Sequence, residues 1–79
     1  MEVQVKLFAT LRKYLPADAV NKTTVLTLDE GQTVAGALAR LAVPPAEAHL
    51  ILVNGQHQTL DHALGPGDMV CVFPPVAGG

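Results

Sequence analysis

The alternation of apolar and polar positions predicts that the chain begins with a strand. Val3, Val5 and Leu7 would lie on one face of an extended segment, and the residues between them are polar. Residues 23–28 are rich in Thr, Val and Leu and contain no Gly or Pro, which predicts a second strand. A short helix is expected between them, at residues 11–15. We expect the two strands to form a hairpin-like pair.

A different spacing predicts the main helix. Val34, Leu38 and Leu41 recur at i, i+4 and i+7 and make one apolar stripe. Thr33 can cap the helix, because its hydroxyl can accept a hydrogen bond from a free N–H of the first turn. The Pro pair at 44–45 prevents the helix from continuing.

Shorter apolar runs predict the remaining strands. Residues 50–53 are followed by Asn-Gly, a strong turn signal, and residues 56–60 would return as a weak edge strand. Residues 69–73 are apolar at all five positions, so we expect a strand covered on both faces. The element order therefore predicts an α+β domain with one helix available to cover one sheet.

Composition narrows the function classes. With 79 residues, the chain is long enough for one small domain. Its formal net charge of -2 disfavours binding to nucleic acid or to an anionic membrane. The single Cys71 cannot form an intramolecular disulfide, and the three His residues match no metal-site spacing, so no metal is expected. No signal-peptide pattern follows Met1, which favours a cytoplasmic location.

Few side chains indicate chemistry. No Ser, Cys or Thr lies in a motif that couples it to a His and a carboxylate, so the chain is not expected to be catalytic alone. Cys71 falls inside an apolar strand, where burial is favoured over a sulfur-relay role. Phe8 follows the polar face of the first strand and Phe73 precedes the tail. From the residues alone, these two rings could equally form an exposed patch or pack in the core.

The last six residues differ from the rest. We expect a domain at 1–73 and an extended tail at 74–79, because Pro74 and Pro75 favour a stiff, extended backbone. Gly78 and Gly79 have no Cβ and could thread a narrow channel. A frayed chain end is the alternative interpretation of two glycines by themselves.

The segment Gly-Asp-Met-Val-Cys-Val-Phe-Pro-Pro-Val-Ala-Gly-Gly resembles the C-terminal signature of the MoaD/ThiS sulfur-carrier family. Leu-Phe-Ala-Thr-Leu-Arg, Gly-Gln-Thr-Val and Val-Asn-Gly support the resemblance, which covers essentially the whole chain and is nearest to the small subunit of molybdopterin synthase. It implies a ubiquitin-like β-grasp fold with a mixed four- to five-stranded sheet, one main helix and a protruding Gly-Gly tail.

The resemblance also implies a chemistry. An E1-like enzyme of the MoeB/ThiF type would use ATP to adenylate the Gly79 carboxylate, which would become a thiocarboxylate; no cofactor would be bound. A large subunit of the MoaE type would then receive the tail and catalyse transfer of the sulfur to a pterin. The implied reactive end is Gly78 and Gly79, and the implied partner-binding residues are Phe8, Phe73, Pro74, Pro75, Val76 and Ala77.

Other functions stay open within and beside this family. The sulfur could serve thiamine, cysteine or methionine synthesis, tRNA thiolation or a tungsten cofactor. The chain could instead be a ubiquitin-like modifier joined through Gly79 to lysines of target proteins. A β-grasp iron-sulfur ferredoxin is excluded, because one Cys cannot supply four thiolate ligands.

Overall fold

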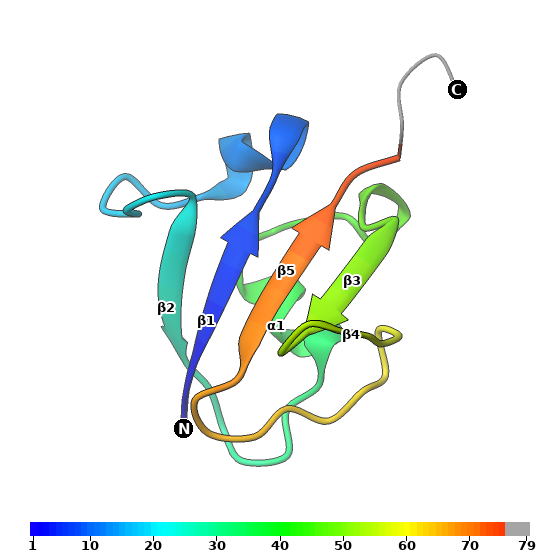
Figure 1. The fold of residues 1–79 in the computed structure, drawn as a ribbon. Coiled ribbons are helices and arrows are strands. Elements are labelled where there is room, and N and C mark those ends of the chain that lie inside the picture. The colour runs from blue at the N-terminus through cyan, green and yellow to red at the C-terminus, as the bar shows by residue number, and fades with distance from the viewer. Residues whose placement is uncertain (76–79) are drawn as a thin grey trace.

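The computed structural model describes residues 1–75 and contains a five-stranded mixed sheet with one α-helix against one of its faces (Figure 1). The strand order is β2-β1-β5-β3-β4. The central strands β1 and β5 are parallel, and the other neighbouring pairs are antiparallel. The elements are β1 (Glu2–Leu7), η1 (Ala9–Tyr14), β2 (Thr23–Thr27), α1 (Val34–Arg40), η2 (Pro45–Glu47), β3 (Leu50–Val53), β4 (Gln56–His57) and β5 (Met69–Phe73).

The expected elements are present, with differences in type or extent. The short amino-terminal helix is a 3-10 helix that starts at Ala9. Helix α1 ends at Arg40, before the Pro pair, and Ala42 takes a positive φ of 61° that turns the chain away. Strand β4 has only two residues, because the segment after it hydrogen-bonds to the start of α1 instead of extending the sheet. The carbonyl oxygens of Leu60 and His62 accept hydrogen bonds from the first two N–H groups of α1.

The start of α1 is capped as the sequence predicts. The Thr33 side chain accepts a hydrogen bond from the Gly36 N–H at 3.2 Å. Such a bond satisfies one of the N–H groups that have no partner within the helix.

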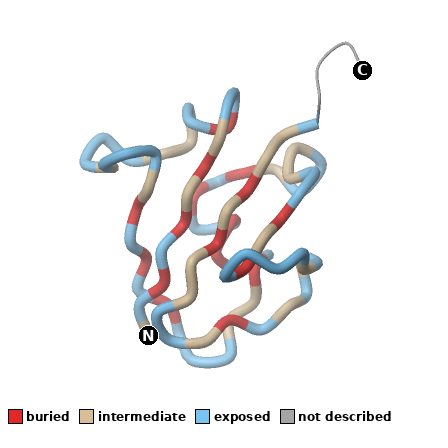
Figure 2. The backbone as a smooth tube through the Cα atoms, viewed as in Figure 1, coloured by how far each residue is buried: buried red, intermediate tan, exposed pale blue. Residues whose placement is uncertain are grey.

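The core lies between α1 and the face of the sheet that it covers. Side chains alternate in burial along β1 and β5, where red segments of the backbone alternate with pale blue or tan ones (Figure 2). Val5, Val70 and Val72 are fully buried, and they belong to the same core cluster as Val34 and Leu38 of the helix.

The expectation that β5 is covered on both faces is wrong. Val70 and Val72 are buried, but Met69, Cys71 and Phe73 on the other face are only half-buried. The single α-helix covers one face of the sheet, and in residues 1–75 the opposite face carries no helix (Figure 1). Consequently the predicted burial of Cys71 is also wrong, since its side chain is half-buried on this open face.

Candidate functional site

Two phenylalanines from opposite ends of the sequence meet on the open face of the sheet. Leu7 of β1 pairs with Val72 of β5 in parallel register, so the residues that follow them lie side by side. The ring centroids of Phe8 and Phe73 are 4.2 Å apart and the rings are within 12° of parallel. Both side chains are half-buried. We refer to this pair as the Phe8–Phe73 stack.

A mostly apolar groove of about 480 Å³ adjoins the stack. Phe73 forms part of its wall, and the His49 N–H donates a hydrogen bond to the Phe73 carbonyl at 2.9 Å, which fixes the end of β5. An apolar hollow of this kind can accept an aliphatic or aromatic side chain of another molecule. The groove is lined by Ala9, Thr10, His49, Leu50, Phe73, Pro74 and Pro75.

The first two residues of the expected tail lie at this groove. Pro74 and Pro75 follow β5 directly and form part of the groove lining, at the same end of the sheet as η1 (Figure 1). The other expected tail residues lie outside the residues that the structure describes: Val76, Ala77, Gly78 and Gly79.

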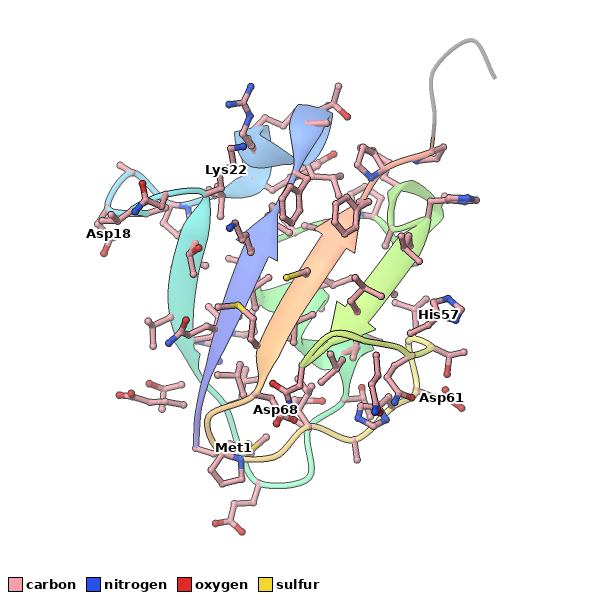
Figure 3. The ribbon with its side chains drawn as sticks, viewed as in Figure 1. Met1, Asp18, Lys22, His57, Asp61 and Asp68 are labelled. Carbon is pink, nitrogen blue, oxygen red and sulfur yellow. The ribbon has the colours of Figure 1, made fainter. Side chains whose placement is uncertain are left out.

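Positive charge is concentrated near the stack. The ammonium nitrogens of Lys6 and Lys22 lie 5.4 and 5.7 Å from the centroid of the Phe8 ring, within the range of a cation–π contact. Lys22 lies at the end of the sheet where β5 ends, whereas Asp61 and Asp68 lie toward the opposite end (Figure 3). Of seven acidic residues, only Asp18 falls within residues 6–22. That segment holds four of the five cationic residues, namely Lys6, Arg12, Lys13 and Lys22.

The 3-10 helix η1 follows Phe8, and its first two residues, Ala9 and Thr10, line part of the groove. Leu11 is buried and anchors the helix to the core. At its end, the Tyr14 hydroxyl donates a hydrogen bond of 3.0 Å to the carboxylate of Glu47 in η2. Partial burial and this hydrogen bond raise the pKa of Tyr14 above its usual value. Both contacts hold the groove wall in place and add no reactive group.

The remaining candidate side chains do not assemble a second site in the described part of the chain. Cys71 lies in register with Lys6 of β1 and Leu52 of β3. Residues 1–75 contain no group of three or more His, Cys, Asp or Glu side chains arranged to hold a metal ion. Over the same residues, no helix is long and apolar enough to cross a bilayer.

Three contributors to this surface were not predicted from the sequence. His49 and Leu50 line the groove because β3 is the other neighbour of β5, a pairing that the apolar runs do not specify. Lys22 reaches the Phe8 ring from the turn that precedes β2, and the sequence pattern does not show which element this turn approaches.

Comparisons with known proteins agree with the architecture. The profile described as Mut7-C ubiquitin matches residues 1–78. The chain is similar to SAMP1 from Haloferax volcanii, with 29% identity and a TM-score of 0.76 over 100% of both chains. It is also similar to a candidate molybdopterin converting factor subunit 1 from Pyrococcus furiosus, with 29% identity, a TM-score of 0.71, and 95% and 98% of the two chains covered.

A more distant likeness shows the fold alone. A chain in the complex of subunits 1 and 2 of molybdopterin-converting factor from Helicobacter pylori is 20% identical over 100% of both chains, with a TM-score of 0.62. No curated protein sequence matches. Together these likenesses confirm the ubiquitin-like β-grasp fold that the sequence resemblance implied.

Proposed function

The chain belongs to the Mut7-C ubiquitin family, and we propose that it is a sulfur carrier whose Gly79 carboxylate is adenylated and then converted to a thiocarboxylate. One observation carries the proposal: Pro74 and Pro75, which follow β5 directly, line an apolar groove beside the Phe8–Phe73 stack. In the sequence, that tail continues from Pro74-Pro75 into Val-Ala-Gly-Gly. A docking surface at the base of a slim tail suits a protein that delivers its end to another active site.

The chemistry is an exchange of one oxygen for sulfur at the carboxyl carbon. A carboxylate resists attack by a sulfur nucleophile, because neither oxygen is a good leaving group. When a carboxylate oxygen of Gly79 attacks the α-phosphate of ATP, pyrophosphate leaves and an acyl-adenylate forms. Attack of sulfide on the acyl carbon then expels AMP and leaves the thiocarboxylate.

The domain contributes binding, and its partners contribute catalysis. An E1-like activating enzyme of the MoeB/ThiF type would bind the domain through the stack and groove while it adenylates Gly79. Aromatic side chains at the centre of an interface tend to contribute strongly to binding, which suits Phe8 and Phe73 to this role. Acids and bases for each step would come from the partner enzymes.

Molybdopterin synthesis is the pathway that we propose. The sulfur would pass to a pterin precursor while the tail lies in a large synthase subunit of the MoaE type. The likeness to the candidate molybdopterin converting factor subunit from Pyrococcus furiosus supports this choice.

A second candidate function is that of a protein modifier, favoured by the likeness to SAMP1, a protein described as a small archaeal modifier. In this case the acyl group of Gly79 would form an isopeptide bond with a lysine ε-amino group, and AMP would leave. The two functions share the activated carboxylate and differ in the nucleophile.

A reconstituted transfer assay tests the carrier proposal. The chain is incubated with its activating enzyme, ATP, sulfide, the large synthase subunit and the pterin precursor. We expect sulfur transfer from the full chain and none after deletion of Gly79, with equal melting temperatures as the control for folding. Transfer by the truncated chain would contradict the proposal. Higher-mass covalent adducts in native cell lysate, without sulfur transfer, would assign the modifier function.

A further inference from the structure

Lys22 occupies a backbone conformation that a side chain normally avoids. Asn21 and Lys22 have φ values of 53° and 64°. They are the two central residues of a tight turn whose flanking residues, Val20 and Thr23, exchange two backbone hydrogen bonds of 3.0 Å. A turn with positive φ at both central positions favours Asn followed by Gly, because Gly has no Cβ to clash with the backbone.

A second turn in the same chain shows the more usual choice. Asn54 and Gly55 connect β3 to β4 with φ values of 52° and 82°, so here Gly fills the position that corresponds to Lys22. A lysine therefore stands where glycine would cost less backbone strain. Strained positions of this kind concentrate at functional sites.

The residues with this strained backbone lie close to the Phe8 ring. Lys22 places its ammonium 5.7 Å from the ring centroid, and Lys6 places a second ammonium 5.4 Å from it. Ala9, immediately after Phe8, also has a positive φ of 53°. Of the five positive-φ residues other than Gly in the described chain, three lie at this corner: Ala9, Asn21 and Lys22.

We propose that Lys6 and Lys22 form a carboxylate-recognition site on the Phe8 ring, which selects an acidic segment of the protein that docks over the Phe8–Phe73 stack. This inference rests on the proposed function only in taking the stack as the docking face. A carboxylate would meet the two ammonium groups, while an adjacent apolar side chain would enter the groove of about 480 Å³. Charge complementarity supports this occupant, because the ammonium groups of both Lys6 and Lys22 lie close to the Phe8 ring centroid, at 5.4 and 5.7 Å.

The same features favour an acidic protein over nucleic acid. The apolar groove suits a side chain, and the rings of Phe8 and Phe73 stack on each other. The net charge of -2 opposes a long polyanion, whereas a local pair of cations suffices for one or two carboxylates.

The test uses a turn variant that removes the charge without straining the fold. Lys22→Gly creates an Asn-Gly turn, so the melting temperature of this variant should equal or exceed that of the wild type. The matched control is Lys13→Ala, which removes a lysine that lies over Tyr14 instead of Phe8. The probe is a short synthetic peptide in which aspartates and glutamates flank a Leu-Phe pair, compared with the same peptide carrying Asn and Gln.

Amide chemical shifts of the labelled protein are followed as each peptide is added at low and high salt. We expect the acidic peptide to shift the signals of Lys6, Phe8, Lys22 and Phe73, and to bind more tightly than the amide peptide. Lys22→Gly should weaken this binding by about two- to fivefold and reduce its salt dependence, because an exposed ion pair contributes modestly and is screened. Lys13→Ala should change it less.

Three results would overturn the inference: equal binding of the acidic and amide peptides, unchanged binding by Lys22→Gly, or tighter binding of a short single-stranded oligonucleotide at the same signals. A loss of melting temperature in Lys22→Gly would show that the lysine stabilises the turn, and would equally contradict the argument from strain. Neither peptide measurement involves Gly79, so the peptide-binding result can be interpreted even if Gly79 fails to load sulfur.

Discussion

Phe8 and Phe73 acquire their contact from strand register and not from proximity in sequence. The sequence placed Phe8 off the apolar face of the first strand, because the alternation from Val3 to Leu7 points the next side chain the other way. It left open whether the two rings share a patch, since the parallel pairing of β1 with β5 joins residues from opposite ends of the chain. Long-range pairing of this kind depends on the whole sheet, which local patterns do not encode.

We predict that Phe8→Ala and Phe73→Ala each weaken binding to the activating enzyme, because a truncated aromatic anchor commonly costs about 2 kcal/mol or more. Binding isotherms measure this loss. Val25→Ala is the matched control, since Val25 is an exposed side chain on the same face of the sheet but in β2, away from the groove. Isotherms that stay unchanged while both Phe variants unfold at lower temperature would assign the rings to packing alone.

Among the elements, α1 and the amino-terminal hairpin could be predicted from local sequence patterns, whereas tertiary contacts determine where the elements end. The cap at Thr33 and the stripe from Val34 to Leu41 follow directly from spacing. The short length of β4 does not, because it depends on Leu60 and His62 turning away to satisfy the helix N–H groups.

Replacing the cap tests the helix directly. Thr33→Ala should lower the free energy of unfolding by about 1 kcal/mol, because the Gly36 N–H loses its acceptor. For a domain of this size, that loss corresponds to a melting temperature lower by roughly 4–8 °C. Thr33→Ser retains the hydroxyl and should unfold near the wild-type temperature. Equal melting temperatures for the Ala and Ser variants would show that the cap contributes nothing.

A second element-level contact joins the turn after β3 to the turn before β5 and should make stability depend on pH. Asp68 accepts hydrogen bonds from the Gly65 N–H at 2.7 Å and the Asn54 side-chain amide at 2.8 Å. These bonds hold the pKa of Asp68 below its ordinary value of 3.8. A carboxyl whose pKa is lower in the folded state stabilises the fold above the unfolded-state pKa, and this stabilisation disappears as pH falls through the folded-state pKa.

We therefore expect the wild type to be more stable than Asp68→Asn near neutral pH, with a difference that shrinks as pH falls below about 4. Urea unfolding of both proteins across this range measures the difference. A difference that stays constant with pH would mean that the charge of Asp68 does not contribute.

In residues 1–75 of the molecule, α1 covers one face of a five-stranded sheet, and the opposite face carries no helix (Figure 1). The apolar run of β5 suggested two covered faces, because hydrophobicity alone does not say what covers a side chain. Met69, Cys71 and Phe73 of β5 lie half-buried on the open face. Within residues 1–75 the one α-helix lies on the other face, so these side chains are accessible to a partner, and Phe73 among them lies next to Pro74 and Pro75 of the groove.

In the proposed function Gly79 carries the sulfur, and the half-buried thiol of Cys71 is the alternative carrier. The most direct measurement is the intact mass of the wild type, of Cys71→Ala and of the chain lacking Gly79 after each is incubated with activating enzyme, ATP and sulfide. We expect replacement of one oxygen by sulfur in the wild type and in Cys71→Ala, and no change in the truncated chain. Sulfur on the truncated chain, or a folded Cys71→Ala protein that fails to load, would contradict it.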